Sequence, residues 1–488
     1  MAITNNHYDV MILGDGLSGV ITGALLAQKR YRVVLLRTVN VESATGEAIK
    51  LRSRPQFFWP DIFDGAFAAP VKNDLGLAHT LRTVLTGQDN TFQVVGDDLR
   101  VDVPGGLANL PGDVAREFPD LSDLKEVIQL LQGLHADLTA GLASEDSYYR
   151  TGLLDYFRHR RLKKQTTQAV ENCRDRRQRL DELLDKPPYG ALFTAPTRFF
   201  SLADPAGDAY APLTFMPLAE QVLHLASGND VTDLFVERLA KRGGQVVSEE
   251  LTLNLSRSSR PFHLDVGRNG ALSADVLLHN LPPCLLPLVW PGRSSDTFLA
   301  RLNKNLEPAW MRYHQTYHLH PDGVPEGMGN LVILTPDHRT LSFEDTLLLV
   351  RDPLRSFSPD RIAMDVVRHV PLAGLDRQTM AALAEDTHQK VCRLCPFIER
   401  HVIERYDQRI WWPDTTGIDL PVGNSPIVYR IPEGRDAWPT ALITPRVDRN
   451  VYMAAADPWA ALNSNAPFAA GLNLYRYILK RHPLKELG

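Results

Sequence analysis

The chain contains 488 residues, which is enough for two or three domains and a large core. Its 44% hydrophobic and 23% charged residues are typical of a soluble globular protein, and the net charge of −5 gives no global basic surface for nucleic acid. The sequence has no apolar run long enough to span a membrane, no apolar signal-peptide core in Met1–Tyr8, and only four cysteines. We therefore expect a cytoplasmic protein without a nucleic-acid partner, and attachment to a membrane surface stays open.

The N-terminal segment has the pattern of a dinucleotide-binding βαβ unit. Residues 8–13 form an apolar run typical of a buried parallel strand. Gly14-Asp15-Gly16-Leu17-Ser18-Gly19 follows at once, and residues 20–29 and 32–36 predict a helix and a second strand. A strand, a glycine turn, a helix and a strand within one short segment together indicate a nucleotide-binding architecture more strongly than the glycines alone.

Five residues of this turn are candidate cofactor ligands, namely Gly14, Gly16, Leu17, Ser18 and Gly19. In such units the first glycine allows a tight turn, the second lets the backbone approach a pyrophosphate, and the third lets helix and strand pack closely. The start of the helix offers N–H groups and a partial positive charge to phosphates. The alternative interpretation is that the glycines only serve packing.

Arg37 stands where this kind of unit usually has an acidic residue for the ribose hydroxyls. An arginine cannot accept a hydrogen bond. It could instead hold the 2′-phosphate of NADP, or it could mark a site that no longer binds a nucleotide. The sequence does not decide between these two interpretations.

The rest of the chain predicts further alternation of helices and strands. Residues 60–110 combine short strands with turns, and residues 113–185 are largely helical. A second α/β block then begins at residue 228, with a helix over residues 230–241 and strands at 245–247, 262–266 and 275–278. Further core strands are predicted at 331–334 and 346–350, helices at 380–393 and 468–480, and a strand leading into a turn at 450–457.

A basic run extends from Arg158 to Arg179 within the helical block. One interpretation is contact with an anionic membrane surface or an acidic protein partner, and the other, which we favour, is a solvated helix face. Only two acidic residues, Glu171 and Asp175, interrupt its nine cations: Arg158, Arg160, Arg161, Lys163, Lys164, Arg174, Arg176, Arg177 and Arg179.

Three histidines alternate along a predicted strand, at His314, His318 and His320, on the same face as Thr316. They could line a substrate pocket or bind a metal, but histidines on one strand lie too far apart for one ion to take all three easily. We favour an exposed sheet face, and we predict no metal site.

The order of these segments resembles the FAD-dependent amine oxidase and phytoene desaturase superfamily. The resemblance rests on the N-terminal glycine turn, on the block from Gly228 through Gly243-Gly244 and Val246-Val247 to Ala274-Asp275-Val276, and on residues 450–457 followed by Gly471. It implies an α/β fold in which a Rossmann-like FAD-binding domain is assembled from discontinuous segments, here 1–60, 215–285 and 440–488. A mixed-sheet α+β substrate domain would comprise 61–112 and 286–439, with a helical insertion at 113–190.

The resemblance also implies roles for particular residues. The glycine turn would face the FAD pyrophosphate, Val247 would hold the adenine edge through its backbone, and Asp457 would lie near the ribityl chain. The reaction would be hydride transfer from an apolar or amine small-molecule substrate to the flavin. No catalytic residue is identified, and an oligomer or a protein complex is compatible with the sequence.

Four departures from the family pattern favour altered or lost FAD binding. Arg37 replaces the acidic residue, and residues 39–51 contain only Gly46 where the family has a Gly-Gly-Arg stretch. Ala456 replaces a glycine before Asp457, and Trp459 begins a turn that lacks the family's glycines. Our leading hypothesis is an FAD-dependent oxidoreductase. The alternative is a non-catalytic relative that keeps the fold and serves as a structural or partner subunit.

Overall fold

The computed structural model describes most of the chain between residues 7 and 484. Gly46 and Gly228 lie outside the described residues. The positions left out inside this range are 38, 43–47, 52–57, 88–89, 107–109, 120, 143–147, 153–154, 206–207, 226–230, 249–250, 253–254, 257–261, 266–270, 338, 340–343, 353–359, 374, 376, 408–426 and 433–443.

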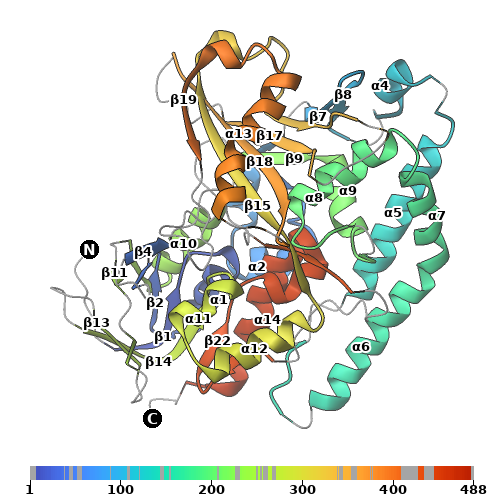
Figure 1. Ribbon diagram of the computed structural model, residues 1–488. Helices are drawn as coiled ribbons and strands as arrows, with labels where there is room; N and C mark the ends of the chain where they lie inside the picture. The colour runs from blue at the N-terminus through green and yellow to red at the C-terminus, as the bar shows by residue number, and fades with distance from the viewer. Residues whose placement is uncertain are drawn as a thin grey trace.

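The first large sheet is built from segments that are far apart in the sequence (Figure 1). Its central order is β10-β2-β1-β14-β13-β12, and β22 pairs with β14 and β21. The pairs β1–β2, β1–β14, β2–β10 and β14–β22 are parallel, as expected for a dinucleotide-binding sheet. Its strands are β1 (His7–Leu13), β2 (Val33–Leu36), β10 (Gln245–Val247), β12 (Leu255–Ser256), β13 (Phe262–Asp265), β14 (Ala271–His279), β21 (Arg446–Asp448) and β22 (Val451–Met453).

Helices α1, α10 and α14 pack together against this sheet. Every residue of α1 from Leu17 to Ala27 is buried, which explains why its sequence is small and apolar on all sides. Nearby are two short helices and a 3₁₀ segment. The bounds are α1 (Leu17–Gln28), α10 (Val231–Lys241), α11 (Leu286–Val289), α12 (Arg293–Asn303), η3 (Pro283–Leu285) and α14 (Ala466–Arg481).

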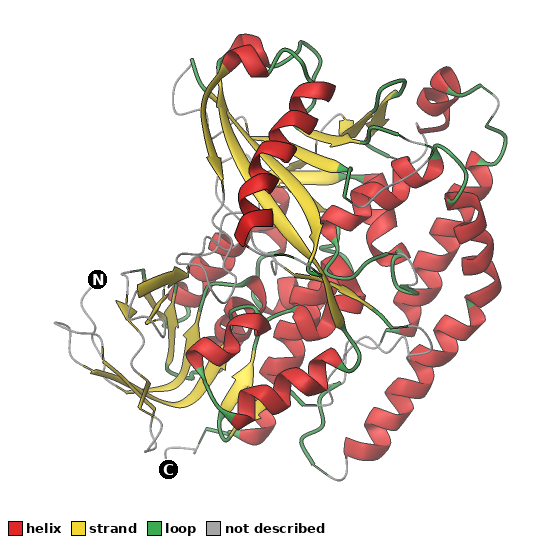
Figure 2. Ribbon diagram, in the orientation of Figure 1, coloured by secondary structure: helices red, strands yellow, loops and turns green. Residues whose placement is uncertain are grey.

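The second large sheet is mixed and lies apart from the first (Figure 2). Its order is β19-β15-β18-β17-β16-β7-β8, with β20 paired to β15, and α13 packs on one face through residues such as Val391. The bounds are β7 (Asn90–Val95), β8 (Arg100–Pro104), β15 (Glu307–Leu319), β16 (Leu331–Leu334), β17 (Leu347–Asp352), β18 (Ile362–Pro371), β19 (Val402–Asp407), β20 (Ile427–Arg430), α13 (Arg377–Leu394), η4 (Pro321–Gly323) and η5 (Glu399–His401).

The middle of the chain supplies helices beside the two sheets, as predicted for residues 113–185 (Figure 2). The bounds are α4 (Leu110–Glu117), α5 (Leu124–Gly141), α6 (Asp155–Asn172), α7 (Arg174–Leu184), η1 (Gly190–Thr194), α8 (Ala195–Phe200) and α9 (Pro212–Glu220). Two three-stranded sheets complete the fold, β11-β3-β4 and β5-β9-β6. Their strands are β3 (Val39–Glu42), β4 (Ala48–Leu51), β5 (Phe58–Pro60), β6 (Leu85–Gly87), β9 (Val222–Leu225) and β11 (Leu251–Thr252).

The fold confirms the predicted class, a Rossmann-like sheet from discontinuous segments beside a mixed sheet with added helices. A first local expectation was wrong. Residues 60–110 contain helices α2 (Ala68–Asp74) and α3 (Ala78–Val84) rather than only strands and turns. Each helix has seven residues, too few to show a helical period, and burial of Ala68, Val71 and Leu81 stabilises them through tertiary contacts. The proposed domain boundaries stay predictions.

The histidine-bearing strand also differs from the favoured interpretation. His314 and Thr316 on β15 are buried rather than exposed, and the Thr316 hydroxyl donates to Asp365 Oδ1 of β18 at 2.5 Å. His320 follows the strand and begins η4, so it does not share the face. Among the described residues, no group of three histidine, cysteine or acidic side chains is placed to hold a metal ion, and no helix is long and apolar enough to cross a membrane.

The close packing of α1 and α14 depends on Gly471. A Cβ at this position would lie 2.8 Å from Ile21 Cγ2 and from the Ser18 carbonyl oxygen, so the helices would have to separate. We expect Gly471→Ala to destabilise the protein by about 1–3 kcal/mol, measured from urea unfolding. Gly112→Ala on α4 is the matched control, because nothing lies within 4 Å of its added Cβ. Equal effects of the two substitutions would contradict this account of the helix contact.

Candidate functional site

The residues predicted from the sequence meet at one edge of the first sheet. The glycine turn follows β1, Arg37 follows β2, and Val247 is the last residue of β10. Asp457 lies four residues beyond the end of β22. Because parallel strands end at the same edge, residues separated by more than 400 positions are brought to a common site, where ligands bind in open α/β sheets.

The glycine turn is held by the segment that follows β14. Gly14 has φ +93°, a conformation that favours glycine, and a Cβ there would lie 2.6 Å from Leu281 Cδ2. A Cβ at Gly19 would lie 2.2 Å from Asn280 Cγ. Gly19 is therefore needed because the Asn280 side chain occupies the space beside it, and not simply because helix and strand are in contact.

The Asn280 side chain makes three hydrogen bonds to the backbone of this turn. Its Nδ2 donates to the carbonyl oxygens of Gly14 at 2.8 Å and Gly16 at 2.7 Å, and its Oδ1 accepts from the Gly19 N–H at 2.9 Å. Asn280 thus caps α1 from a different strand. The sequence gives only a weak signal for this role, since Asn280 precedes Leu281-Pro282-Pro283, a pattern that predicts only the end of a strand. The parallel pairing of Leu13 with His279 is what places it under the turn.

The first amides of α1 remain as hydrogen-bond donors at this site. Gly19 N–H is capped, and the Ser18 hydroxyl donates to the Ala454 carbonyl oxygen at 2.6 Å. In the part of the chain that the structure describes, the backbone N–H groups of Leu17 and Ser18 donate to no other residue. Two buried helix-terminal donors with a partial positive charge are suited to a phosphate group.

Arg37 is held between two carboxylates. Its Nη2 lies 3.2 Å from Asp15 Oδ2 and 2.8 Å from Asp233 Oδ1. Burial alone lowers the pKa of Arg37, but the charges of Asp15 and Asp233 and their hydrogen bonds outweigh that effect and raise the pKa overall. The three side chains together carry a formal charge of −1, which does not favour a 2′-phosphate. The ion pairs thus do not support the NADP interpretation, and the role of Arg37 toward a nucleotide stays a prediction.

Val247 lies beside this cluster. Its carbonyl oxygen accepts a hydrogen bond from the Arg37 backbone N–H at 3.0 Å, so the ends of β2 and β10 are fixed to each other. This carbonyl is already engaged by the protein. The role of Val247 at an adenine edge stays a prediction.

Asp457 joins the first sheet to the second. It begins η6 (Asp457–Asn465), is 2% exposed, and its Oδ1 accepts from the Tyr429 hydroxyl of β20 at 2.9 Å. Asp457 also interacts electrostatically with Arg312 on β15. Burial lowers the pKa of Arg312 to about 10, and the negative charge of Asp457 opposes that shift. The predicted cofactor-side carboxylate is therefore buried at the junction of the two sheets.

A polar part of the second sheet lies near this junction. Arg312 pairs with His369 across β15 and β18, and the His369 ring packs 4.8 Å from the Phe199 ring. Burial lowers the pKa of His369 well below its usual value, and the charges of Arg312, Arg198 and His314 lower it further. Neutral His369, buried Arg312 and partly buried Arg198 form a polar cluster, of which the sequence pattern at His314 indicated only a part.

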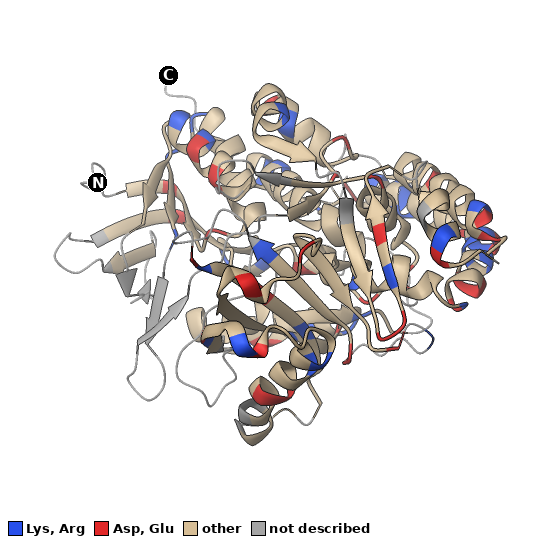
Figure 3. Cartoon of the chain, turned by 90° about the horizontal axis from the view of Figure 1, so that it is seen from above, with Lys and Arg blue, Asp and Glu red and all other residues tan. Residues whose placement is uncertain are grey.

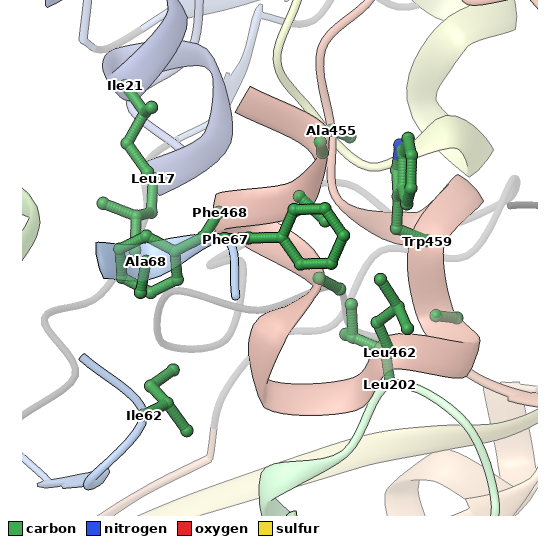
Figure 4. Close-up of a cluster of buried hydrophobic side chains, with 14 of the residues drawn as sticks. Leu17, Ile21, Ile62, Phe67, Ala68, Leu202, Ala455, Trp459, Leu462 and Phe468 are labelled. Atoms are coloured by element: carbon green, nitrogen blue, oxygen red, sulfur yellow. The ribbon is translucent and has the colours of Figure 1, made fainter. Parts of the chain in front are cut away.

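Trp459 lies in a cluster of buried apolar side chains between α1, α2 and η6 (Figure 4). Its indole Nε1 donates to the Tyr149 hydroxyl at 2.7 Å, and the rings of Phe67, Tyr148 and Tyr149 pack edge-on around it. Trp459 has no exposed surface, and Leu17 of the glycine turn belongs to the same cluster. Trp459 is therefore packed among the chain's own side chains, and whether it crowds a cofactor stays a prediction.

No protein-family model and no curated protein matches the sequence. Solved structures do match the fold. A putrescine oxidase bound to putrescine is 12% identical, with 97% of this chain and 99% of that chain covered and a TM-score of 0.51. An oxidoreductase from Methanosarcina mazei is 11% identical, with 95% and 98% coverage and a TM-score of 0.52. The chain has the fold of FAD-dependent amine oxidases. At these identities the similarity concerns the fold.

The glycine-turn region fits the dinucleotide part of the cofactor that this fold implies. The amides of Leu17 and Ser18 are suited to a pyrophosphate, and the carboxylates of Asp15 and Asp233 can accept hydrogen bonds from ribose hydroxyls. Although Arg37 takes the place of the acidic residue in the sequence, two carboxylates lie beside it in space, on the glycine turn and on α10. The cluster around Trp459 is an observation against a bound cofactor, because the chain's own side chains fill the space around the segment that follows Asp457.

We expect Asn280→Ala to destabilise the protein by about 1–3 kcal/mol, because it leaves the Gly19 amide and two turn carbonyls without their partner. The measurement is urea unfolding followed by circular dichroism. Asn303→Ala, at an exposed position on α12, is the matched control and should change stability little. A loss confined to the control, or none in either variant, would refute the capping role.

The turn after Asp457 is fixed by another buried carboxylate. Asn463, with φ 51°, donates from Nδ2 to Asp208 Oδ2 at 2.7 Å. Burial raises the pKa of Asp208 to about 7, against the opposing effects of the Tyr210 amide, Asn463 and Arg177.

This shift predicts a pH dependence of stability. Between pH 4 and 7 the folded protein holds a proton at Asp208 that the unfolded chain has released, so stability should fall as pH rises through this range and then level off. The slope should not exceed about 1.4 kcal/mol per pH unit. Urea unfolding at several pH values would measure it. Asp208→Asn should remove the slope, whereas Asp185→Asn on the exposed end of α7 should keep it.

Proposed function

We propose that the protein is an FAD-dependent oxidoreductase that takes a hydride from an amine or apolar small-molecule substrate. The observation that carries this proposal is the convergence of two helix-terminal amides, of Leu17 and Ser18, and two carboxylates, of Asp15 and Asp233, at one sheet edge. The fold shared with putrescine oxidase supports it. A flavin, when bound, supplies the hydride acceptor.

The chain's own residues would bind and orient this cofactor. The first amides of α1 would bind the pyrophosphate, and Arg37 would hold the carboxylates of Asp15 and Asp233 toward the ribose hydroxyls. Asp457 and Tyr429 would fix the junction at which the two sheets meet. The polar cluster that contains Arg312 and His369 would border the substrate side, and the burial of these two side chains excludes water from them.

A second candidate is a non-catalytic relative that acts as a structural or partner subunit. The fully buried cluster of Trp459, Phe67, Tyr148 and Tyr149 favours it, because these side chains satisfy one another without a ligand. In this candidate the Asn280 contacts stabilise the fold alone. Both candidates require the same architecture and differ in whether a flavin enters it.

The visible spectrum of the purified protein, before and after incubation with FAD, decides between them. We expect flavin bands near ~450 nm, FAD released in a 1:1 ratio on denaturation, and bleaching on addition of an amine such as putrescine or of an apolar substrate. A colourless protein that FAD cannot reconstitute would refute the oxidoreductase and leave the second candidate.

A matched pair of variants on α10 tests the site assignment. Asp233→Asn should weaken FAD binding about tenfold, because it removes a charged acceptor and loosens Arg37. Glu237 lies four residues later and pairs only with Lys241 among the described contacts. The Glu237→Gln variant should therefore bind FAD as the unsubstituted protein does. Equal affinities in a titration of all three proteins would contradict the assigned ribose site.

A further inference from the structure

The basic run divides into two parts with different surroundings. On α7 the cations face acidic residues: Arg179 Nε lies 2.7 Å from Glu126 Oε1 of α5, and Arg177 Nε lies 2.9 Å from Asp181 Oδ1. Arg176 also pairs with Asp137 of α5. Figure 3 shows segments of both signs side by side where these helices lie. Three of the four cations on α7 are thus paired with acidic side chains, whereas Arg174 is exposed.

The first half, on α6, combines cations with exposed aromatic rings. Phe157, Arg160, Arg161 and Lys164 follow the helical spacing i, i+3, i+4 and i+7, so they share one face, and all four are exposed. Phe157 is 71% exposed and its neighbour Tyr156 is 47% exposed, with the two rings in edge contact at 5.6 Å. Leu162 and Thr166 are the buried residues of the opposite face.

Other cations surround this start of α6. Arg150 lies over the Tyr156 ring at 5.5 Å, and Lys480 at the end of α14 lies 3.7 Å from Asp155. Asp155 itself is balanced by Lys480 and by Arg158 at 3.7 Å. Helix α6 runs along the lower right edge of the molecule in Figure 1, so its first residues lie at the periphery. We call the group Tyr156, Phe157, Arg160, Arg161 and Lys164 the α6 patch.

We propose that the α6 patch docks the protein onto an anionic membrane surface. Cationic side chains are attracted to anionic headgroups, and an aromatic ring gains free energy by entering the interfacial layer beside them. A purely acidic protein surface would use the three cations but would give no reason for a 71% exposed phenylalanine among them. The proposal is independent of flavin binding, because none of these residues belongs to the dinucleotide site.

Co-sedimentation of the full chain with vesicles tests this proposal. Vesicles of phosphatidylcholine alone are compared with vesicles that contain phosphatidylserine, at low and at high salt. We expect binding only to the anionic vesicles, and weaker binding as salt screens the charges. Arg160→Gln with Arg161→Gln should weaken binding roughly 25-fold, about fivefold for each charge. Phe157→Ser should weaken it about tenfold.

Matched variants separate docking from general effects of charge or apolar surface. Arg174→Gln with Arg242→Gln removes the same charge from exposed positions outside the patch, and Phe397→Ser removes another phenylalanine, 63% exposed, elsewhere on the chain. These controls should bind as the unsubstituted protein does. Melting curves confirm that each variant is folded.

Three results with vesicles would overturn the proposal: no binding to anionic vesicles at low salt, equal binding to neutral vesicles, or equal losses in patch and control variants. Salt-sensitive binding to poly-glutamate without vesicle binding, unaffected by Phe157→Ser, would also overturn it and would assign the patch to an acidic protein partner.

Discussion

The hydrogen bonds between Asn280 and the glycine turn hold together the elements on which the site depends. Three bonds from one side chain fix the end of β1, the start of α1 and the segment after β14. Because Asn280 lies where Gly19 has no Cβ, α1 can approach β14 closely enough for the Ser18 hydroxyl to reach Ala454 beyond β22. The segments from the two ends of the chain are joined in this way.

Charge is arranged at this edge by partners from different elements. Arg37 ends β2, Asp15 belongs to the glycine turn, and Asp233 lies in the first turn of α10. An arginine at the position of an acidic ligand therefore does not remove acceptors from the site. It holds two carboxylates whose mutual repulsion would otherwise cost free energy. At the other end of the site, Asp457 is buried against Tyr429, so a carboxylate that follows the first sheet fixes a strand of the second sheet.

The same dependence on neighbours separates the halves of the basic run. Arg160 and Arg179 are both arginines of the same basic run, yet only Arg179 is paired with an acidic residue of α5, Glu126. The aromatic residues at the start of α6 stay exposed because Leu162 and Thr166 take the buried face of the helix. A basic run is thus a compound feature, and its parts can serve different roles.

The sequence by itself determined the local elements that carry their own periodicity and turns. The strand at residues 8–13, the glycine turn, the helix after it and the second strand follow from apolar runs and glycine positions, and the later strand at 331–334 follows in the same way. The resemblance in order and spacing was enough for the fold class. Helices α2 and α3 were missed because each has only seven residues and depends on tertiary burial.

Only the tertiary structure decided what those residues touch. The partners of Arg37 lie 22 and 196 positions away, and Asn280 lies 261 positions beyond Gly19, so no local pattern announces these contacts. Parallel pairing of β1 with β14 sets the position of Asn280, and packing of α10 on α1 sets that of Asp233. Spacing along the chain predicts a turn that can bind a dinucleotide. Which side chains cap, neutralise or fill that turn depends on the three-dimensional register of distant strands.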